Sequence, residues 1–222
     1  MNSSTLRLSL VITLLGAALA ASAQNLIVNG GFENPVVGNG NLGIYSGGST
    51  AITGWTVTGT DVLILDTNYG EPGNGIARFA SQEGVQSLDI TGSANTGLAD
   101  GVRQTISTAM GMTYRVSFSV GRAQSSVNSS LYNSPSTVRL SIGGGPLTSY
   151  TNSNSTSGTT NWQSFTTSFV ATGTSTDVAF LNGTPDNSFA GLDNVSVQAV
   201  PEPASLAALG LGAAALLRRR KK

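Results

Sequence analysis

The chain has 222 residues and a formal net charge of zero, and only 10% of its residues are charged. It contains no cysteine and no histidine, which excludes disulfides, thiolate nucleophiles, zinc–thiolate sites, imidazole bases and histidine-ligated metals. Carboxylate chemistry, oxygen-ligated cations, and polar or aromatic recognition remain open to this protein.

The first 23 residues are typical of a secretory signal peptide. A positive charge near the start precedes the apolar run 8–20, and Ala21 and Ala23 then form a small-x-small cleavage pattern. We therefore expect the mature chain to begin at Gln24. The alternative is a membrane anchor, but a membrane span needs about 20 apolar residues and this run is shorter.

The central segment, residues 24–199, is acidic although the whole chain is neutral. It contains five arginines, no lysine and ten acids, so its net charge is −5. A basic face is the usual signature of a nucleic-acid-binding protein, so this composition predicts no nucleic-acid partner. The length is sufficient for one hydrophobic core.

The central segment is predicted to be all-β. Several stretches alternate apolar and polar residues with period 2, which is the pattern of half-buried strands, and Gly, Asn, Asp and Pro clusters separate them. The continuous apolar run in 61–65 predicts a strand that is buried on both sides. Many short strands with turn signals favour a jelly-roll β-sandwich. The alternating stretches are 52–57, 113–120, 137–142, 162–170 and 195–199.

Two stretches, 124–136 and 148–161, consist mostly of Ser, Thr, Asn and Gly. Such residues bury little apolar area, so both stretches are expected to be long solvated loops. They are either a tolerant surface or a hydroxyl- and amide-rich rim around a sugar site, because these groups match carbohydrate hydroxyls in hydrogen bonding.

The C-terminal segment, residues 200–222, has three parts in order. Two prolines in three residues end the preceding strand. As a helix, the apolar part spans about 21 Å, which is less than a ~30 Å hydrocarbon core, and the basic end stays cytoplasmic by the positive-inside rule. We expect only a transient stay at the inner membrane. The three parts are Pro201, Glu202 and Pro203, then the apolar helix 204–217, then Arg218, Arg219 and Arg220 in the basic tail 218–222.

This arrangement resembles the PEP-CTERM sorting signal. The resemblance implies recognition by an exosortase, a membrane transpeptidase that cuts near Pro-Glu-Pro in Gram-negative bacteria that make extracellular polysaccharide. It also implies a location at the cell surface or outside the cell after processing. The alternative is an ordinary tail anchor.

Motifs along the central segment resemble the choice-of-anchor family of bacterial exported proteins, type C. The opening motif, NLIVNGGFE at 25–33, and the closing motif, GLDNVSV at 191–197, are the most specific. The segment is more distantly similar to galactose-binding-like jelly rolls, including carbohydrate-binding modules and a plant cell-wall family of unassigned function. The resemblance implies a galactose-binding-like fold on an exported protein, without a settled ligand.

Glu33 and Asp193 lie in the opening and closing motifs. In the carbohydrate-binding jelly rolls that this chain resembles, acids at these positions often hold a structural Ca²⁺ together with backbone carbonyls, here near Asn29 and Gly30. Calcium prefers such hard oxygen ligands. The alternative is that both acids form turn hydrogen bonds without a metal.

The two tryptophans are candidate sugar-stacking platforms. Trp55 is expected in the alternating stretch 52–57, on the opposite face from Ile52, and Trp162 at the start of a strand. For both, the alternative is packing in the core or between the sheets.

The most direct functional hypothesis is an exported, non-catalytic protein that binds carbohydrate or exopolysaccharide in the envelope or biofilm. The first alternative is a purely structural envelope or biofilm protein without a specific ligand. The second is a glycosidase, since paired carboxylates need no histidine. The acids weighed for that role are Asp61, Asp66, Glu71 and Glu83, and none stands in an assignable motif.

Overall fold

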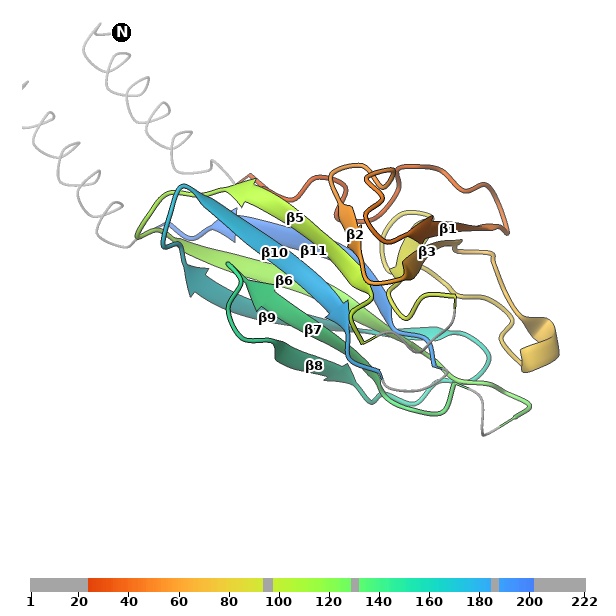
Figure 1. Cartoon of the computed structure of the whole chain (residues 1–222). Helices are drawn as coiled ribbons and strands as arrows, with labels where there is room; N and C mark the ends of the chain where they lie inside the picture. The colour runs from red at the N-terminus through yellow and green to blue at the C-terminus, as the bar shows by residue number, and fades with distance from the viewer. Residues whose placement is uncertain (1–23, 94–97, 129–131, 185–187, 202–222) are drawn as a thin grey trace, which may run out of the picture.

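The computed structural model describes residues 24–93, 98–128, 132–184 and 188–201, and both the expected signal peptide and the sorting helix lie outside them. Within this part of the chain, eleven β-strands and one short 3-10 helix, η1, form two packed antiparallel sheets (Figure 1). No described helix is long and apolar enough to cross a membrane. The predicted all-β jelly-roll sandwich is confirmed.

One sheet has six strands in the order β1-β3-β4-β11-β6-β9, and the other has five in the order β2-β5-β10-β7-β8. Most neighbouring strands are distant in sequence, as in jelly rolls. The elements are β1 (Leu42–Ser46), β2 (Thr56–Thr58), β3 (Asp61–Asp66), η1 (Pro72–Asn74), β4 (Gln86–Asp89), β5 (Gly101–Ser107), β6 (Thr113–Ala123), β7 (Ser136–Ile142), β8 (Thr148–Asn152), β9 (Thr160–Val170), β10 (Ser175–Asn182) and β11 (Gly191–Ala199).

The main core lies between the sheets and follows the alternation in the sequence. In β6, the apolar residues Tyr114, Val116, Phe118 and Val120 are all buried there. Phe118 meets Phe180 of β10 across the sandwich with ring centroids 5.0 Å apart. Burial of such side chains supplies the main favourable term for folding.

Strand β3 is buried on both sides, as its continuous apolar run predicts. Ile64 belongs to the main core, whereas Leu63 and Leu65 face outward from the six-stranded sheet. These outward leucines pack in a second cluster with Phe79 and Phe189. Residues 67–80 contribute Tyr69, Ile76 and Phe79 to this cluster, and we call them the cover segment.

The expected strand 52–57 is mostly a turn, which corrects the prediction for Trp55. The Trp55 amide donates to the Ile52 carbonyl at 2.9 Å, and Gly54 has φ 82. Because the chain turns here, Ile52 and Trp55 do not lie on opposite faces, and both are buried in the main core. Only residues 56–58 are a strand.

The second low-complexity stretch is also more ordered than predicted. Thr148–Asn152 forms strand β8, which pairs with β7, so the expectation of a loop over 148–161 is wrong for these residues. Tyr150 is the reason, because its ring contacts Phe118 edge to face at a centroid distance of 5.0 Å. The described residues of 124–135 lie outside the strands, as expected.

The sandwich has two distinct ends. At the end we call the tail end, the Val200 amide donates to the Thr113 carbonyl at 2.8 Å, and the chain leaves toward the sorting signal. The opposite, distal end gathers the cover segment and the loops that follow β6 and β8 (Figure 1). Buried Arg122 holds these last two loops together. Its guanidinium donates to the carbonyls of Asn133, Ser134, Ser153 and Asn154 at 2.8, 3.2, 3.1 and 2.8 Å.

Gly30 is required by close backbone packing. Its carbonyl accepts from the Val195 amide at 2.9 Å, and a Cβ at position 30 would overlap the Val195 carbonyl oxygen. We expect Gly30→Ala to lower the free energy of unfolding by about 2 kcal/mol, which corresponds to a thermal midpoint lower by roughly 4–8 °C. The matched control is Gly73→Ala, since a Cβ at Gly73 meets nothing within 4 Å. Equal midpoints for the two variants, measured by circular dichroism, would contradict this packing.

Candidate functional site

A single register row crosses the outer face of the six-stranded sheet near the distal end. Each residue in the row is the direct pairing partner of the next, from one edge strand to the other. Its centre holds two glycines, and a carboxyl group and an indole flank them. The row is Ile44, Leu63, Asp89, Gly191, Gly121 and Trp162.

Trp162 covers the two glycines of this row. A Cβ at Gly121 or at Gly191 would lie 2.8 Å from the Cη2 atom of the indole, so neither position accepts a side chain without a shift of the ring. The indole Nε1 donates to the Ala80 carbonyl at 2.8 Å, at the last residue of the cover segment. Trp162 is only half-buried. The ring of this predicted ligand-binding residue therefore packs on the sheet and is still partly exposed to solvent.

A small cavity of about 90 Å³ lies over Leu63 and Asp89 of this row, between the sheet and the cover segment. Leucines 42, 63 and 65 and the rings of Tyr69, Phe79 and Tyr132 form most of its wall. Glu71 and Asp89 supply two carboxyl groups. We call this the acid cavity.

Asp89 is the buried carboxyl of the acid cavity. Its side chain is 8% exposed, and Oδ1 accepts from the Thr91 amide at 3.0 Å, the Thr91 hydroxyl at 2.7 Å and the Ala190 amide at 3.4 Å. Burial, with a smaller contribution from Glu71, raises the pKa of Asp89 to about 7 against the lowering effect of the hydrogen bonds from Thr91 and Ala190. Asp89 therefore exchanges its proton near neutral pH.

Glu71 is held in place by its neighbours from three directions. It accepts from Tyr132 Oη at 2.7 Å, from Asn74 Nδ2 at 2.9 Å and from Tyr69 Oη at 3.4 Å. Burial and the Glu71 carboxylate raise the pKa of both tyrosines, so their hydroxyls stay protonated donors. The cavity therefore contains one firmly positioned carboxylate next to one titratable carboxyl.

Asp193 lies elsewhere on the outer face of the six-stranded sheet, and its role is structural. It is fully buried, and Oδ2 accepts from the amides of Gln82 and Glu83 at 2.8 and 2.9 Å, while Oδ1 accepts from the Asn194 amide at 2.7 Å. Burial raises the pKa of Asp193 to about 7 against the lowering effect of these three amides. The carboxyl therefore fastens the 82–86 loop to β11.

Glu33 binds the other end of the same loop. Its Oε1 accepts from the amides of Val85 and Gln86 at 2.9 and 3.0 Å. The resemblance to carbohydrate-binding jelly rolls implies that Glu33 and Asp193 lie together, and both side chains bind one loop in the structure. The partners of the named oxygens are N–H donors, however, and these are unsuitable neighbours for a cation.

The donor set does not fit the predicted calcium ion in this arrangement. Both oxygens of Asp193 and one of Glu33 are used by backbone amides, whereas calcium takes six to eight oxygen ligands. No group of three or more His, Cys, Asp and Glu that could hold a metal occurs among the described residues. Calcium binding stays a prediction that the resemblance implies, and its alternative, hydrogen bonding by the two acids, matches the contacts of these side chains.

Trp55 does not offer a face to a ligand in this structure. It is 2% exposed, stacks on Phe32 with centroids 5.5 Å apart, and donates from Nε1 to the Asn29 carbonyl at 3.0 Å. The packing alternative describes this residue, and the sugar-platform hypothesis moves to Trp162 alone.

The other acids weighed for catalysis are dispersed. Asp61 accepts from the amide and hydroxyl of Ser93, both at 2.6 Å, and Asp66 accepts from two backbone amides. Glu83 is exposed. Of the four, Glu71 lines a cavity together with a second acid, Asp89.

Sequence reasoning missed Asp89 and Tyr132 as site residues. Asp89 alternates with Leu88 and Ile90, so the pattern predicts an exposed residue on the outer face. Its burial comes from the cover segment, a loop that precedes β4, and from Tyr132, which is distant in sequence. Tyr132 stands in a polar stretch, and an isolated aromatic residue there is the only signal that could have pointed to it.

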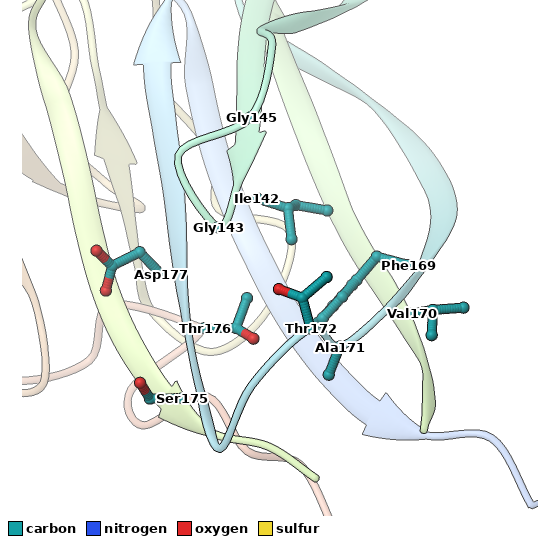
Figure 2. Close-up of a pocket in the computed structure, with 10 residues that line it drawn as sticks. All are labelled: Ile142, Gly143, Gly145, Phe169, Val170, Ala171, Thr172, Ser175, Thr176 and Asp177. Atoms are coloured by element: carbon teal, nitrogen blue, oxygen red, sulfur yellow. The ribbon is translucent and has the colours of Figure 1, made fainter. Parts of the chain in front are cut away.

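A larger cavity of about 420 Å³ lies at the tail end, between the turns that follow β7 and β9 (Figure 2). Ile142, Phe169 and Thr176 are among its lining residues. Asp177 is the one charged residue in that lining, and Figure 2 shows its side chain directed away from Ile142 and Phe169. Its carboxylate accepts instead from the Thr105 hydroxyl. This cavity therefore offers apolar and hydroxyl groups without a charge.

The hydrogen bonds of Asp193 predict a specific cost for replacing it. Asp193→Asn puts an NH₂ group against the amides of residues 82–83 or of Asn194, whichever way it turns, so we expect a loss of about 2 kcal/mol in the free energy of unfolding. Denaturant titration measures this loss. The wild-type thermal midpoint is expected to be the same in EDTA and in added Ca²⁺. A midpoint that rises with Ca²⁺ would establish calcium binding and contradict the purely hydrogen-bonded arrangement.

The pKa of Asp89 predicts that stability falls as the pH rises. Between its ordinary value of 3.8 and about 7, the folded state keeps a proton that the unfolded state has lost. The free energy of unfolding should therefore be higher at pH 5 than at pH 8. Asp89→Asn keeps Oδ1 as an acceptor, and it should make the free energy of unfolding less dependent on pH. A smaller decrease with rising pH should persist in this variant, because the pKa of Asp193 is also raised. Identical pH profiles for wild type and Asp89→Asn would show that the argument about Asp89 is wrong.

Solved structures share the fold at low identity. The Stig cyclase Fisc from Fischerella sp. TAU, in complex with an indole compound, is 18% identical, covers 81% of this chain and 99% of its own, and has a TM-score of 0.57. TmCBM61 in complex with beta-1,4-galactotriose is 13% identical over 80% of this chain and 100% of its own, with a TM-score of 0.43. The CBM22-1 xylan-binding domain of Paenibacillus barcinonensis Xyn10C is 17% identical over 74% and 97%, at 0.41. No curated protein sequence matches the chain.

Family comparisons account for nearly all of the chain from residue 25 onward. The PEP-CTERM protein-sorting motif matches residues 199–221, which confirms the resemblance of the C-terminal segment and implies export and processing by an exosortase. The family described as "Protein of unknown function (DUF642)" matches residues 25–198, the whole jelly-roll domain. The chain therefore belongs to the DUF642 family and carries a PEP-CTERM sorting signal.

Proposed function

We propose that this exported protein binds polysaccharide at the distal end of its six-stranded sheet and serves as a non-catalytic component of the cell surface or biofilm. The observation that carries the proposal is Trp162. Its half-buried indole is fixed over two glycines of the sheet by the hydrogen bond to Ala80, 2.8 Å long. A positioned aromatic ring with one polar end is a common platform for a sugar ring.

The surface around Trp162 supplies hydrogen-bonding groups of the type that sugars use. Along β9, the side chains of Ser164, Thr166 and Ser168 follow Trp162 on the same outer face, and all three are exposed. The loops held by Arg122 at the distal end are rich in hydroxyl and amide groups. Each hydroxyl both donates and accepts, so it can bind a sugar hydroxyl in either sense.

The sorting signal is consistent with this location. The chain leaves the domain at the tail end, where Val200 is bonded to Thr113. Before processing, the tail end is therefore the one nearer the membrane segment, and the distal end is free to meet polymer outside the cell.

Two alternatives remain testable. A purely structural surface protein needs no ligand. A glycosidase is favoured only by the pairing of Glu71 with Asp89 in one cavity, since a catalytic acid needs a raised pKa and a second carboxylate. The volume of about 90 Å³ is well below the roughly 300 Å³ at which ligand pockets begin, so the cavity is too small for sugars on both sides of a scissile bond.

Affinity electrophoresis of the processed protein through a panel of polysaccharides tests the proposal. Trp162→Phe keeps an aromatic ring over the glycines and removes the indole N–H, and it should weaken binding by about five- to ten-fold. The matched control is Thr105→Ala on the outer face of the other sheet, which should bind as wild type does.

Absence of retention by every polysaccharide would contradict the proposal and leave the structural alternative. Loss of binding in Thr105→Ala but not in Trp162→Phe would place the site on the five-stranded sheet and contradict the proposed location. Release of reducing ends during incubation would establish the glycosidase.

A further inference from the structure

We propose that the acid cavity binds an organic ammonium group, so that the polysaccharide recognised is one with free amino sugars. This inference rests on the proposed function and names its ligand class. It follows from three features of the cavity: its aromatic wall, its two carboxyl groups, and its size.

The wall of the acid cavity contains three aromatic rings, of which Phe79 contacts the other two. Tyr69 stacks on Phe79 with centroids 5.9 Å apart, and Tyr132 meets Phe79 edge to face, also at 5.9 Å. Ring faces attract cations within about 6 Å, and sites lined by several aromatic rings are used for substituted ammonium ions. The leucines that complete the wall match the carbons next to the nitrogen.

The charge in the cavity has one sign. Glu71 and Asp89 line it, and no Lys or Arg is among the described residues of its wall. All hydrogen bonds that Asp89 accepts within the described part of the chain go to Oδ1, which leaves Oδ2 for a ligand. An ammonium group supplies the missing positive charge and a donor for Oδ2 of Asp89.

The size and composition of the cavity separate an organic ammonium from other ligands. A volume of about 90 Å³ equals roughly three waters at ~30 Å³ each, enough for a nitrogen and the carbons beside it. A metal ion needs more oxygen ligands than two carboxyls among rings and leucines provide. A neutral hydroxyl would leave the negative charge of Glu71 uncompensated.

The cavity is open to a chain end or a side group of a polymer. Tyr69, Glu71 and Tyr132 are half-buried, and Ser93 at the rim is exposed. The whole central segment has a net charge of −5, which attracts a polymer that carries many ammonium groups. Long-range attraction and the local site therefore favour the same class of ligand.

Binding should depend on pH in a defined direction. The titratable groups that face Asp89 from the elements packed on it are Tyr69, Glu71 and Tyr132, all neutral or negative. Because burial and Glu71 raise the pKa of Asp89 to about 7, it is mostly uncharged at pH 6 and mostly ionised at pH 8. The affinity for a permanently charged alkylammonium ion should therefore increase from pH 6 to pH 8.

Isothermal titration calorimetry of the processed protein tests the inference with three probes. These are a β-1,4-linked glucosamine oligomer, its N-acetylated counterpart of equal length, and tetramethylammonium. We expect the glucosamine oligomer to bind at least ten-fold more tightly than the acetylated one. Glu71→Gln should weaken glucosamine binding by about ten-fold, since it removes a charge-assisted hydrogen bond. Glu83→Gln, an exposed acid outside the cavity, is the matched control and should not change it.

Asp89→Asn is the second variant, because Glu71 also positions two tyrosines and its replacement can disturb the fold. Thermal melting identifies a folded variant, and Asp89→Asn should lose the increase in tetramethylammonium affinity between pH 6 and pH 8.

Equal binding of both oligomers, unaffected by Glu71→Gln, overturns the ammonium site and leaves the proposed polysaccharide function standing. Binding of tetramethylammonium without either oligomer overturns the amino-sugar ligand and assigns the cavity to small amines. Binding of none of the three probes overturns the ammonium site. The polysaccharide panel with Trp162→Phe then decides the proposed function separately.

Discussion

The packing of aromatic rings onto two glycines controls the outer face of the six-stranded sheet. Gly121 and Gly191 lie side by side in the register, and Trp162 and Phe189 occupy the space that their side chains would take. Because these rings lie low on the sheet, the cover segment approaches closely enough to bury Leu63 and Leu65. The second cluster, the acid cavity and the exposure of Trp162 all follow from this arrangement.

Carboxyl groups in this domain have two different roles. Asp193 and Glu33 accept hydrogen bonds from backbone amides of one loop. These bonds hold the loop against the sheet. Asp89 and Glu71 instead meet in a cavity whose other walls are rings and leucines. The buried acids of this domain accept from N–H and O–H donors, and Oδ2 of Asp89, which accepts none of them among the described residues, is the atom at which we propose that a cationic ligand binds.

The architecture could be predicted from the sequence where the pattern is local. Period-2 alternation identified β6, β7 and β9, and the apolar run at 61–65 indicated a strand covered on both faces. The partners could not be predicted, because they come from far along the chain. Asp89 alternates like an exposed residue, but the cover segment and the distant Tyr132 bury it. The prediction for Trp55 is wrong for a local reason, because a turn at Gly54 interrupts the expected alternation of the strand.

The central claim is that ligand binds over the outer face of the six-stranded sheet at the distal end. Backbone amide chemical shifts of the processed protein, followed by NMR during titration with a glucosamine oligomer, test it most directly. The account predicts that the amides of residues 69–71, 89–93 and 132 and of Trp162 shift together and saturate with one affinity. Shifts confined to the outer face of the five-stranded sheet, around Thr105 and Asp177, would contradict it.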